Sequence, residues 1–287
     1  MKYAFIKAQE TDHKVICLCD ALGVSSSGYY DWRLRTPCAR RQENKRLLEK
    51  IRRIYDQHKG RYGSPRIHAA LKQEDENVSR GRVERLMRQN GIEAQRAKRH
   101  KRIYRQREQQ KAASNVLARQ FEATKVNEKW VSDITFIPTV AGYVYLATVL
   151  DLYSRAIVGW SMSERINGEL VLDALNMAIE QRGEPHGVLV HSDQGSQYTA
   201  QAYRDWLSRH NMICSMSRKG DCFDNAVAES FFRTLKEELV KERRFKTRQE
   251  AKQAIFEYIE IYYNRQRLHS YLNYTTPFEY ENMQSVA

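Results

Sequence analysis

Residues 129–138 read KWVSDITFIP and residues 143–151 read YVYLATVLD, and these two stretches decide the fold class. The first is rich in β-branched and aromatic residues and ends at Pro138, so it predicts a β-strand. The second is an almost unbroken apolar run, which is typical of a central strand covered on both faces. A tight turn at Leu152–Ser154 and a third strand at Arg155–Met162 then predict an antiparallel meander.

Helices and strands alternate after this meander. The pattern predicts a helix at Gly168–Arg182 and a strand at Val188–Asp193. A helix that Thr199 caps then runs through Leu207, and it is followed by a strand at Met212–Ser217 and a long helix at Phe223–Val240. The order β-β-β-α-β-α-β-α predicts an α/β domain, a mixed sheet with flanking helices. This order resembles the ribonuclease-H-like fold.

Three carboxylates of this domain occupy unusual positions. Asp133 lies inside the first strand among apolar residues, Asp193 ends the fourth strand, and Glu229 lies on the last long helix. A buried charge is costly unless it is paired or bound to a cation, and α/β domains bind ligands at the carboxyl ends of strands. Oxygen ligands suit Mg²⁺, and two ions about 3.5–4 Å apart serve phosphoryl transfer. Singly, the three acids also fit a buried ion pair, a loop cap and a helix surface; jointly, they favour a metal site.

Charge divides the chain into two halves. The net charge is +13, and residues 1–125 hold 30 basic and 14 acidic side chains, whereas residues 126–287 hold 18 and 21. A basic half favours a polyanion partner, because each neutralised phosphate releases counterions. The five scattered cysteines argue against a disulfide framework, and neither a membrane span nor a signal peptide is visible. We therefore expect a cytoplasmic, nucleoid-associated protein without a membrane partner.

The basic half predicts an all-α region. A helix at His13–Leu22, a turn at Gly23 and a helix from Ser25 to Leu34 have a helix-turn-helix outline, although plain packing of a helical hairpin explains it equally well. Further helices are predicted at Arg46–His58, from Pro65 to Leu71 and from Ser79 to Gly91. The last one presents outward arginines that suit a DNA groove, with a solvated face as the alternative: Arg80, Arg82, Arg85 and Arg88.

A strongly basic segment follows these helices. Residues 96–107 hold seven basic side chains and no acid, which predicts a linker or an arm that runs along phosphates. Its candidate DNA contacts are Arg96, Lys98, Arg99, Lys101 and Arg102. The sequence predicts five parts of the chain. A helical segment at residues 1–40 precedes a helix-turn-helix-type DNA-binding domain at 41–95 and this linker at 96–123. The catalytic core at 124–240 and a C-terminal helical extension at 241–287 follow.

Several local sequences resemble one known family. They are WVSDITF at 130–136, DLYSR at 151–155, HSDQGSQY at 191–198, the segment 225–232, and YNRQRLHS at 263–270 followed by Thr276-Pro277. With 35 residues between Asp193 and Glu229, the chain resembles the retroviral-integrase-like transposases that carry an Asp-Asp-(35)-Glu motif. Within them, it is similar to the second-reading-frame product of bacterial insertion sequences of the insertion-sequence-three group. The resemblance covers almost the whole chain.

The resemblance implies the chemistry. Asp133, Asp193 and Glu229 are the implied catalytic residues and ligands of two divalent ions, Mg²⁺ or Mn²⁺. The implied function is a DNA transposase that nicks DNA at the ends of its element and joins the freed 3′-hydroxyl to another phosphodiester. The implied partners are element-end and target DNA, at least one further copy of the chain, and an upstream-frame transposase subunit. A structure-selective nuclease on the same fold and a non-enzymatic DNA-binding regulator are the alternative functions.

Three further residues belong to the expected site. In the family a Lys or Arg follows the glutamate by seven residues, and here Lys236 shares a helix face with Glu229 and suits a phosphate. Asn225 also shares that face, where it either orients a carboxylate or a DNA group or simply begins the helix. His191 is expected to hydrogen-bond to a metal-binding carboxylate rather than to bind the metal itself.

The remaining candidates are weighed against structural roles. The rival carboxylates Asp151 and Asp224 are expected to close a turn and to cap a helix. An amphipathic helix is predicted at Thr247–Tyr263. Arg265 and Arg267 follow it as candidate phosphate contacts, with packing of a closing helix as the alternative.

Overall fold

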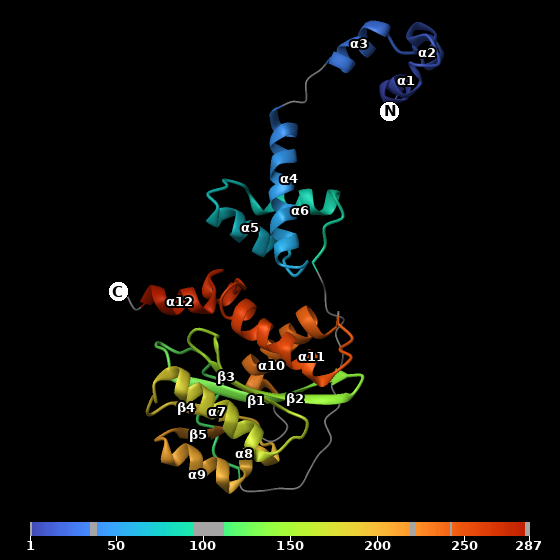
Figure 1. Cartoon of the computed structure of the whole chain (residues 1–287). Helices are drawn as coiled ribbons and strands as arrows, with labels where there is room; N and C mark the ends of the chain where they lie inside the picture. The colour runs from blue at the N-terminus through green and yellow to red at the C-terminus, as the bar shows by residue number, and fades with distance from the viewer. Residues whose placement is uncertain (1, 35–38, 95–111, 219–221, 242, 285–287) are drawn as a thin grey trace.

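The computed structural model describes residues 2–34, 39–94, 112–218, 222–241 and 243–284 (Figure 1). At the N-terminus, three short helices form a small unit around the buried side chains of Ile6, Cys19 and Tyr29: α1 (Lys2–Gln9), α2 (Val15–Leu22) and α3 (Ser26–Leu34). Gly23 ends α2 in the left-handed conformation, with φ 59°, as predicted. The predicted arginine-rich segment 96–102 lies outside the described residues.

A second helical unit contains α4 (Ala39–Gln57), α5 (Ser64–Gln73) and α6 (Arg80–Gln89). Pro65 lies in the first turn of α5, and the Ser79 Oγ accepts the N–H of Arg82 at the start of α6, as the sequence predicted. The core of this unit also contains Leu268, from the far end of the chain. The helical unit and the C-terminal segment therefore share one hydrophobic core.

The α/β domain is built on a five-stranded mixed sheet with the strand order β3-β2-β1-β4-β5. Its strands are β1 (Lys129–Thr139), β2 (Gly142–Asp151), β3 (Ile157–Ser163), β4 (Leu189–Ser192) and β5 (Ile213–Met216). The first three strands are antiparallel, and β4 runs parallel to both β1 and β5. The predicted fold class, a mixed ribonuclease-H-like sheet preceded by a helical region, is confirmed.

Helices cover both faces of the sheet (Figure 1). One face packs against α7 (Gly168–Arg182), α8 (Ser196–Thr199) and α9 (Gln201–Arg209). The other packs against α10 (Ala226–Leu235), the π-helix η2 (Lys236–Val240), α11 (Arg248–Phe256) and the π-helix η3 (Glu257–Tyr263). Because side chains alternate along a strand, Trp130 packs toward α7 and Val131 toward α10. The short 3₁₀ segments η1 (Cys222–Asn225) and η4 (Ser270–Leu272) and the helix α12 (Pro277–Gln284) complete the domain.

Three local predictions were wrong in detail. Thr199 does not cap the next helix, because it ends α8 and donates its hydroxyl proton to the Gly195 carbonyl at 3.3 Å. The two long helices predicted near the C-terminus each change from α to π geometry, at Lys236 and at Glu257.

No helix among the described residues is long and apolar enough to cross a membrane.

Candidate active site

Two aspartates lie at the same level of the sheet, Asp133 within β1 and Asp193 directly after the end of the parallel strand β4. β1 pairs with β4 through Lys129–Leu189, Trp130–Val190 and Val131–His191, so paired residues are 60 positions apart. Asp133 and Asp193 are also 60 positions apart, and they follow the last pair by two residues. Since neighbouring strands lie about 4.8 Å apart, this register brings both carboxylates to one corner of the sheet, on the face that α10 covers.

Tyr198 ties this corner together from behind. Its side chain is buried, and its hydroxyl lies 3.1 Å from the Ser132 Oγ. Burial raises the pKa of Tyr198 well above its ordinary value, and the nearby charges of Asp133 and Asp193 raise it further. Both aspartates therefore act on one buried, neutral phenol. Tyr198 is the last residue of the HSDQGSQY motif, and no pattern in the sequence alone pointed to this role.

Both aspartates are oriented by short-range backbone bonds. The Asp133 Oδ1 accepts the N–H of Ile134 at 2.8 Å, and the Asp193 Oδ1 accepts the N–H of Gly195 at 2.9 Å. Although Asp193 as a whole remains exposed, nearby protein atoms partly desolvate its carboxyl and raise its pKa, against the effect of the Gly195 bond. A cation at this corner would favour the charged form of both groups.

Glu229 approaches the same corner from α10. The helix begins after Asn225, whose buried side chain donates from Nδ2 to the Ser132 carbonyl at 3.3 Å. This bond attaches the start of α10 to β1 one residue before Asp133. Glu229 lies one helical turn after Asn225, in the first turn of α10, where the helix dipole favours a negative charge. The three acids therefore belong to one face and one end of the sheet.

The oxygen donors at this corner suit a hard divalent cation. Carboxylate oxygens are the ligands that Mg²⁺ and Mn²⁺ prefer. The Oδ1 of buried Asn225 has no hydrogen-bond partner in the described part of the chain, so a further oxygen acceptor lies beside β1. Among the described residues, no three His, Cys, Asp or Glu side chains already form a metal-sized cluster. Mutual repulsion opposes the convergence of three carboxylates that no cation neutralises.

Lys236 lies beyond the acids along β1. It begins η2, seven residues after Glu229, and its Nζ lies 4.6 Å from the ring centroid of Phe136. Phe136 follows Asp133 by three residues on the same strand. The ammonium group therefore lies beside β1, three residues beyond Asp133, and its contact with a phosphate stays a prediction.

His191 was expected to hydrogen-bond to a metal-binding carboxylate, but its buried ring contacts a serine hydroxyl instead. Its Nδ1 lies 2.8 Å from the Ser215 Oγ, which also accepts the backbone N–H groups of Val116 and Leu117 at 3.0 Å each. Because Ser215 already accepts two protons, its hydroxyl donates to Nδ1 and leaves the imidazole proton on Nε2. Burial lowers the pKa of His191 to about 4, so the ring is neutral. It joins β4 to β5 beneath the site.

The two rival carboxylates have structural roles. Asp151 is buried, accepts the N–H groups of Asn127 and Tyr153 at 2.8 Å each, and closes the turn after β2 as expected. Asp224 does not cap a helix. Its fully buried carboxylate accepts from Arg119 Nε at 2.8 Å and from Arg218 Nε at 3.1 Å. These bonds connect the segment before β1, the end of β5 and the start of α10.

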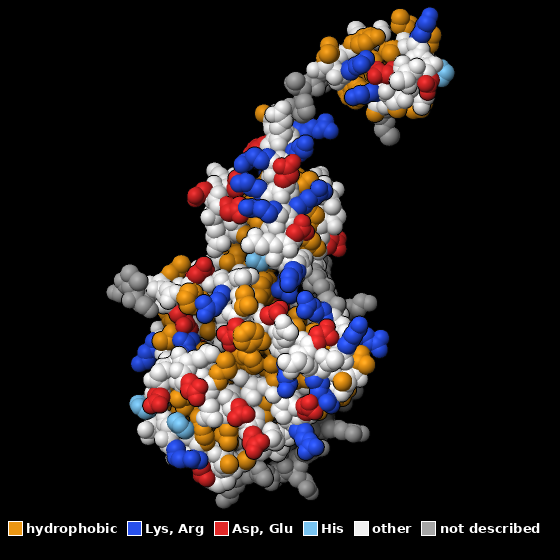
Figure 2. All heavy atoms as spheres, in the orientation of Figure 1, with side chains coloured by type: hydrophobic (Ala, Val, Ile, Leu, Met, Phe, Trp, Pro, Cys, Tyr) orange, Lys and Arg blue, Asp and Glu red, His pale blue; other side chains and the backbone are white. Residues whose placement is uncertain are grey.

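The expected DNA-contacting arginines fall into two groups. Arg80, Arg85 and Arg88 of α6 are exposed, as is Arg265, whose guanidinium lies 5.0 Å from the Phe278 ring centroid. Figure 2 shows Lys and Arg side chains on the visible surface of the α4–α6 unit, interspersed with acids. In the second group, acceptors of the chain itself hold the guanidinium: Arg82 binds Glu43 and Asn44, and buried Arg267 binds Glu238.

Comparison with known proteins decides the family. Two models described as integrase core domain match residues 123–222 and 229–284, and a model described as HTH-like domain matches residues 42–101. The chain is 37% identical over 284 residues to the transposase InsF for insertion sequence IS3A of Escherichia coli strain K12, covering 98% of this chain and 99% of that relative. The chain belongs to the IS3-type insertion-sequence transposases.

Further relatives extend this assignment. The transposase for insertion sequence element IS904 of Lactococcus lactis subsp. lactis strain IL1403 is 41% identical to this transposase over 251 residues, which are 88% of this chain and 99% of the relative. The HTLV-2 integrase catalytic core domain in complex with magnesium has a TM-score of 0.41 at 16% identity, covering 55% of this chain and 97% of that one. An intasome chain from simian T-cell lymphotropic virus has a TM-score of 0.46 at 13% identity, covering 81% and 74%.

Proposed function

We propose that this transposase cleaves DNA at the ends of an insertion sequence and joins the freed ends to target DNA, with Asp133, Asp193 and Glu229 as its catalytic carboxylates. The observation that carries the proposal is the β1–β4 register, which sets the two aspartates side by side under the start of α10. The relatives, named as transposases of insertion sequences, support the same activity.

The three carboxylates are the proposed ligands of two divalent ions, Mg²⁺ or Mn²⁺. Such ions, when bound, activate an attacking oxygen and stabilise the leaving one in phosphoryl transfer. The chain's own residues hold the reactants in place. Asn225 fixes α10 against Ser132, Tyr198 closes the corner toward the core, and Lys236 offers an ammonium group to a DNA phosphate beside the acids.

DNA recognition belongs to the basic half in this proposal. The exposed Arg80, Arg85 and Arg88 of α6 are the proposed groove contacts, and exposed Arg265 is a proposed phosphate contact. Two element ends require two active sites, so the working complex contains at least two copies of the chain. An upstream-frame subunit is the further partner that the family resemblance implies.

The test is the substitution Asp193→Asn in the full chain. We expect it to lower Mg²⁺-dependent joining of labelled element-end DNA by more than about a hundredfold, because a metal ligand is lost. DNA affinity and thermal stability should stay close to those of the parent. Asp173→Asn is the matched control, because Asp173 is an exposed carboxylate on α7, across the sheet.

The alternatives give different results in this assay. Undiminished joining by the Asp193→Asn variant would reject the assigned site. A parent chain that cleaves branched DNA but never joins ends is a structure-selective nuclease. A chain that binds DNA but neither cuts nor joins it with Mg²⁺ or Mn²⁺ is a regulator.

A further inference from the structure

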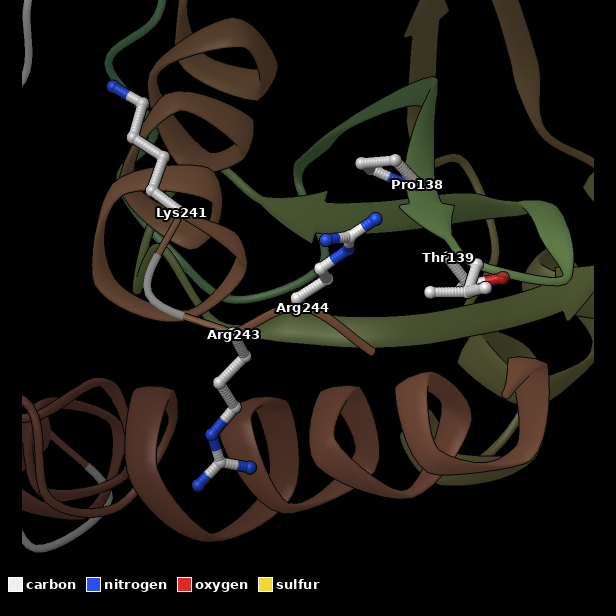
Figure 3. A pocket seen from close by; sticks show the side chains of 6 residues that line it. Pro138, Thr139, Lys241, Arg243 and Arg244 are labelled. Carbon is white, nitrogen blue, oxygen red and sulfur yellow. The ribbon is translucent and has the colours of Figure 1, made fainter. Parts of the chain in front are cut away.

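A basic pocket of about 380 Å³ opens between the β1–β2 hairpin and the turn that follows η2. We call it the hairpin pocket, and its lining residues are Pro138, Thr139, Val140, Lys241, Arg243 and Arg244. In Figure 3 the Arg244 side chain reaches toward Pro138, while those of Lys241 and Arg243 point to either side. The volume lies in the range of small-ligand sites, ~300–1,000 Å³, so a nucleotide-sized group fits.

The positive charge of the hairpin pocket is not neutralised by the described part of the chain. Lys241, Arg243 and Arg244 are exposed, and none of them forms an ion pair with another described residue. None of the six lining residues is acidic. This distinguishes them from Arg82 and Arg267, which carboxylates of the chain itself hold. Cations gathered without counter-charges create a potential that attracts a polyanion.

Both walls of the hairpin pocket continue elements that carry the candidate active site. β1 runs five residues from Asp133 to Pro138, which is about 17 Å at 3.4 Å per residue. β4 pairs with β1 only as far as Val131, and no other described strand pairs with the later part of β1 on that side. Pro138 suits such an edge because it lacks an N–H. Lys236 lies between the acids and the hairpin pocket. The cations therefore continue in a row away from the acids.

Exposed aromatic rings border the same row. Phe136 and Tyr143 are 50% and 52% exposed, and their ring centroids lie 5.4 Å apart across the hairpin. Large exposed aromatic side chains interleaved with cations are typical of surfaces that bind nucleic-acid strands, because bases stack on the rings while cations bind phosphates. This observation points to a nucleic-acid strand and not to a free anion.

We propose that the hairpin pocket is a DNA-strand subsite in which Arg244, flanked by Lys241 and Arg243, binds a backbone phosphate a few nucleotides from the phosphate held at the three acids. The ~17 Å separation along β1 is larger than the distance between neighbouring phosphates of a strand, so the two phosphates are not adjacent. The proposal rests on the proposed function, because it takes the acids as the place of reaction. It assigns a role to Lys241, Arg243 and Arg244, which the sequence alone did not single out.

Cross-linking tests this position directly. The full-length variant Arg244→Cys is mixed with branched DNA that joins an element-end duplex to a target duplex, with one thiol tethered to a phosphate at successive distances from the junction. We expect the disulfide yield to rise to a single peak a few nucleotides from the junction, and to be low at the junction itself. Arg209→Cys, on exposed α9 across the sheet, and the parent chain with its own cysteines are the controls. A flat profile for Arg244→Cys, like that of the controls, overturns the proposal.

Salt dependence provides a second, independent readout. Arg244→Ala should lower the slope of log affinity against log salt for the branched DNA by about 0.9, the value for one lost duplex phosphate contact. Arg209→Ala should leave the slope unchanged, and an unchanged slope for Arg244→Ala contradicts the subsite.

The proposed function and the proposed subsite can fail separately. Cross-links at residue 244 in a chain that never joins DNA refute only the function, and Asp193-dependent joining with a flat profile refutes only the subsite.

Discussion

Asp224 shows how one buried charge can fix the geometry of the candidate site. Its carboxylate accepts from the Asn115 side chain at 2.9 Å, in addition to the two arginines. It directly precedes Asn225, which holds α10 against β1 at Ser132. The arginines, Arg218 first, hold the pKa of Asp224 far below its ordinary value. The charged form of Asp224 therefore stabilises the corner on which Glu229 depends.

We expect Asp224→Asn to reduce the free energy of unfolding by about 2 kcal/mol at pH 7, because hydrogen bonds to a charged acceptor are replaced by weaker ones. A pKa that is lower in the folded state makes this contribution complete at neutral pH. It is lost progressively as the pH falls below the ordinary aspartate value of ~3.9. Urea unfolding at pH 7 and pH 3.5 should therefore show the difference between variant and parent shrinking in acid. Equal stability at pH 7 would contradict the role, and Asp173→Asn is the neutral control.

The same residues show what the sequence could reveal and what it could not. Asp133 and Asp193 stand out in the sequence as candidates, because an acid within a strand or at its carboxyl end is unusual among its immediate neighbours. The partner of Arg267 is 29 positions away, and Asp224 binds Arg119 from 105 positions away. Nothing in the local pattern distinguishes an arginine that faces DNA from one that faces a carboxylate of the same chain. The sequence alone therefore could not show that Arg267 binds Glu238 of the same chain.

At the scale of elements, β3 and α7 approach each other at Gly159 more closely than any side chain allows. A Cβ at this position would lie 2.1 Å from the Ala174 carbonyl oxygen and 2.7 Å from the Ala178 backbone nitrogen. Both contacts are with backbone atoms, so no change of rotamer relieves them. The bare strand surface at Gly159 thus sets the distance between the sheet and the helix that covers it.

Gly159→Ala should therefore lower the free energy of unfolding by about 1–3 kcal/mol, the usual cost of overpacking a core. Gly168→Ala is the matched control, because a Cβ there meets nothing within 4 Å. Alanine in the first turn of α7 should leave stability unchanged or raise it slightly. Chemical denaturation of both variants measures the effect, and equal midpoints for the two would refute the close approach as the constraint.

The strand meander was predictable, whereas the two π-helical segments were not. Strands reveal themselves locally, through β-branched residues and apolar runs that fit two buried faces. The π segments η2 and η3 meet where the Tyr258 hydroxyl donates to Glu238 at 2.9 Å. Glu238 also forms a buried ion pair with Arg267, whose Nη2 lies 2.9 Å from the Glu238 Oε1. Both changes from α to π geometry therefore occur where segments distant in the sequence contact each other. A short stretch of sequence does not contain such contacts.

At the scale of the whole molecule, the α4–α6 unit is docked on the catalytic domain near the helix that carries Glu229. The Arg61 Nε donates to the Glu238 carbonyl at 3.1 Å, and the Arg66 Nε donates to the Leu268 carbonyl at 3.0 Å. Glu238 follows Glu229 by nine residues on the continuous α10–η2 helix. The helical unit that carries the α6 arginines is thereby held at a fixed distance from the candidate active site.

Tyr62 is the centre of this docking. Its ring stacks on His58 with centroids 3.7 Å apart and an interplanar angle of 8°. Burial, with the charge of Arg61, lowers the pKa of His58 to about 4, so the stacked imidazole is neutral at pH 7. The Tyr62 hydroxyl accepts the Leu268 N–H at 2.8 Å and donates to the Gln266 carbonyl at 3.2 Å. Two backbone groups of the C-terminal segment thus depend on one hydroxyl of the helical unit.

Tyr62→Phe should loosen this docking without disturbing either core. The Leu268 N–H loses its acceptor, which costs about 1–2 kcal/mol, so its hydrogen exchange should become roughly 5–30-fold faster. Amides of β1 and β4 should keep their protection. Tyr55→Phe is the matched control, because the Tyr55 hydroxyl donates to the Glu93 carbonyl within the helical unit, at 2.7 Å. If the Leu268 amide exchanges at the parent rate in Tyr62→Phe, or equally fast in both variants, Tyr62 does not hold the two parts of the transposase together.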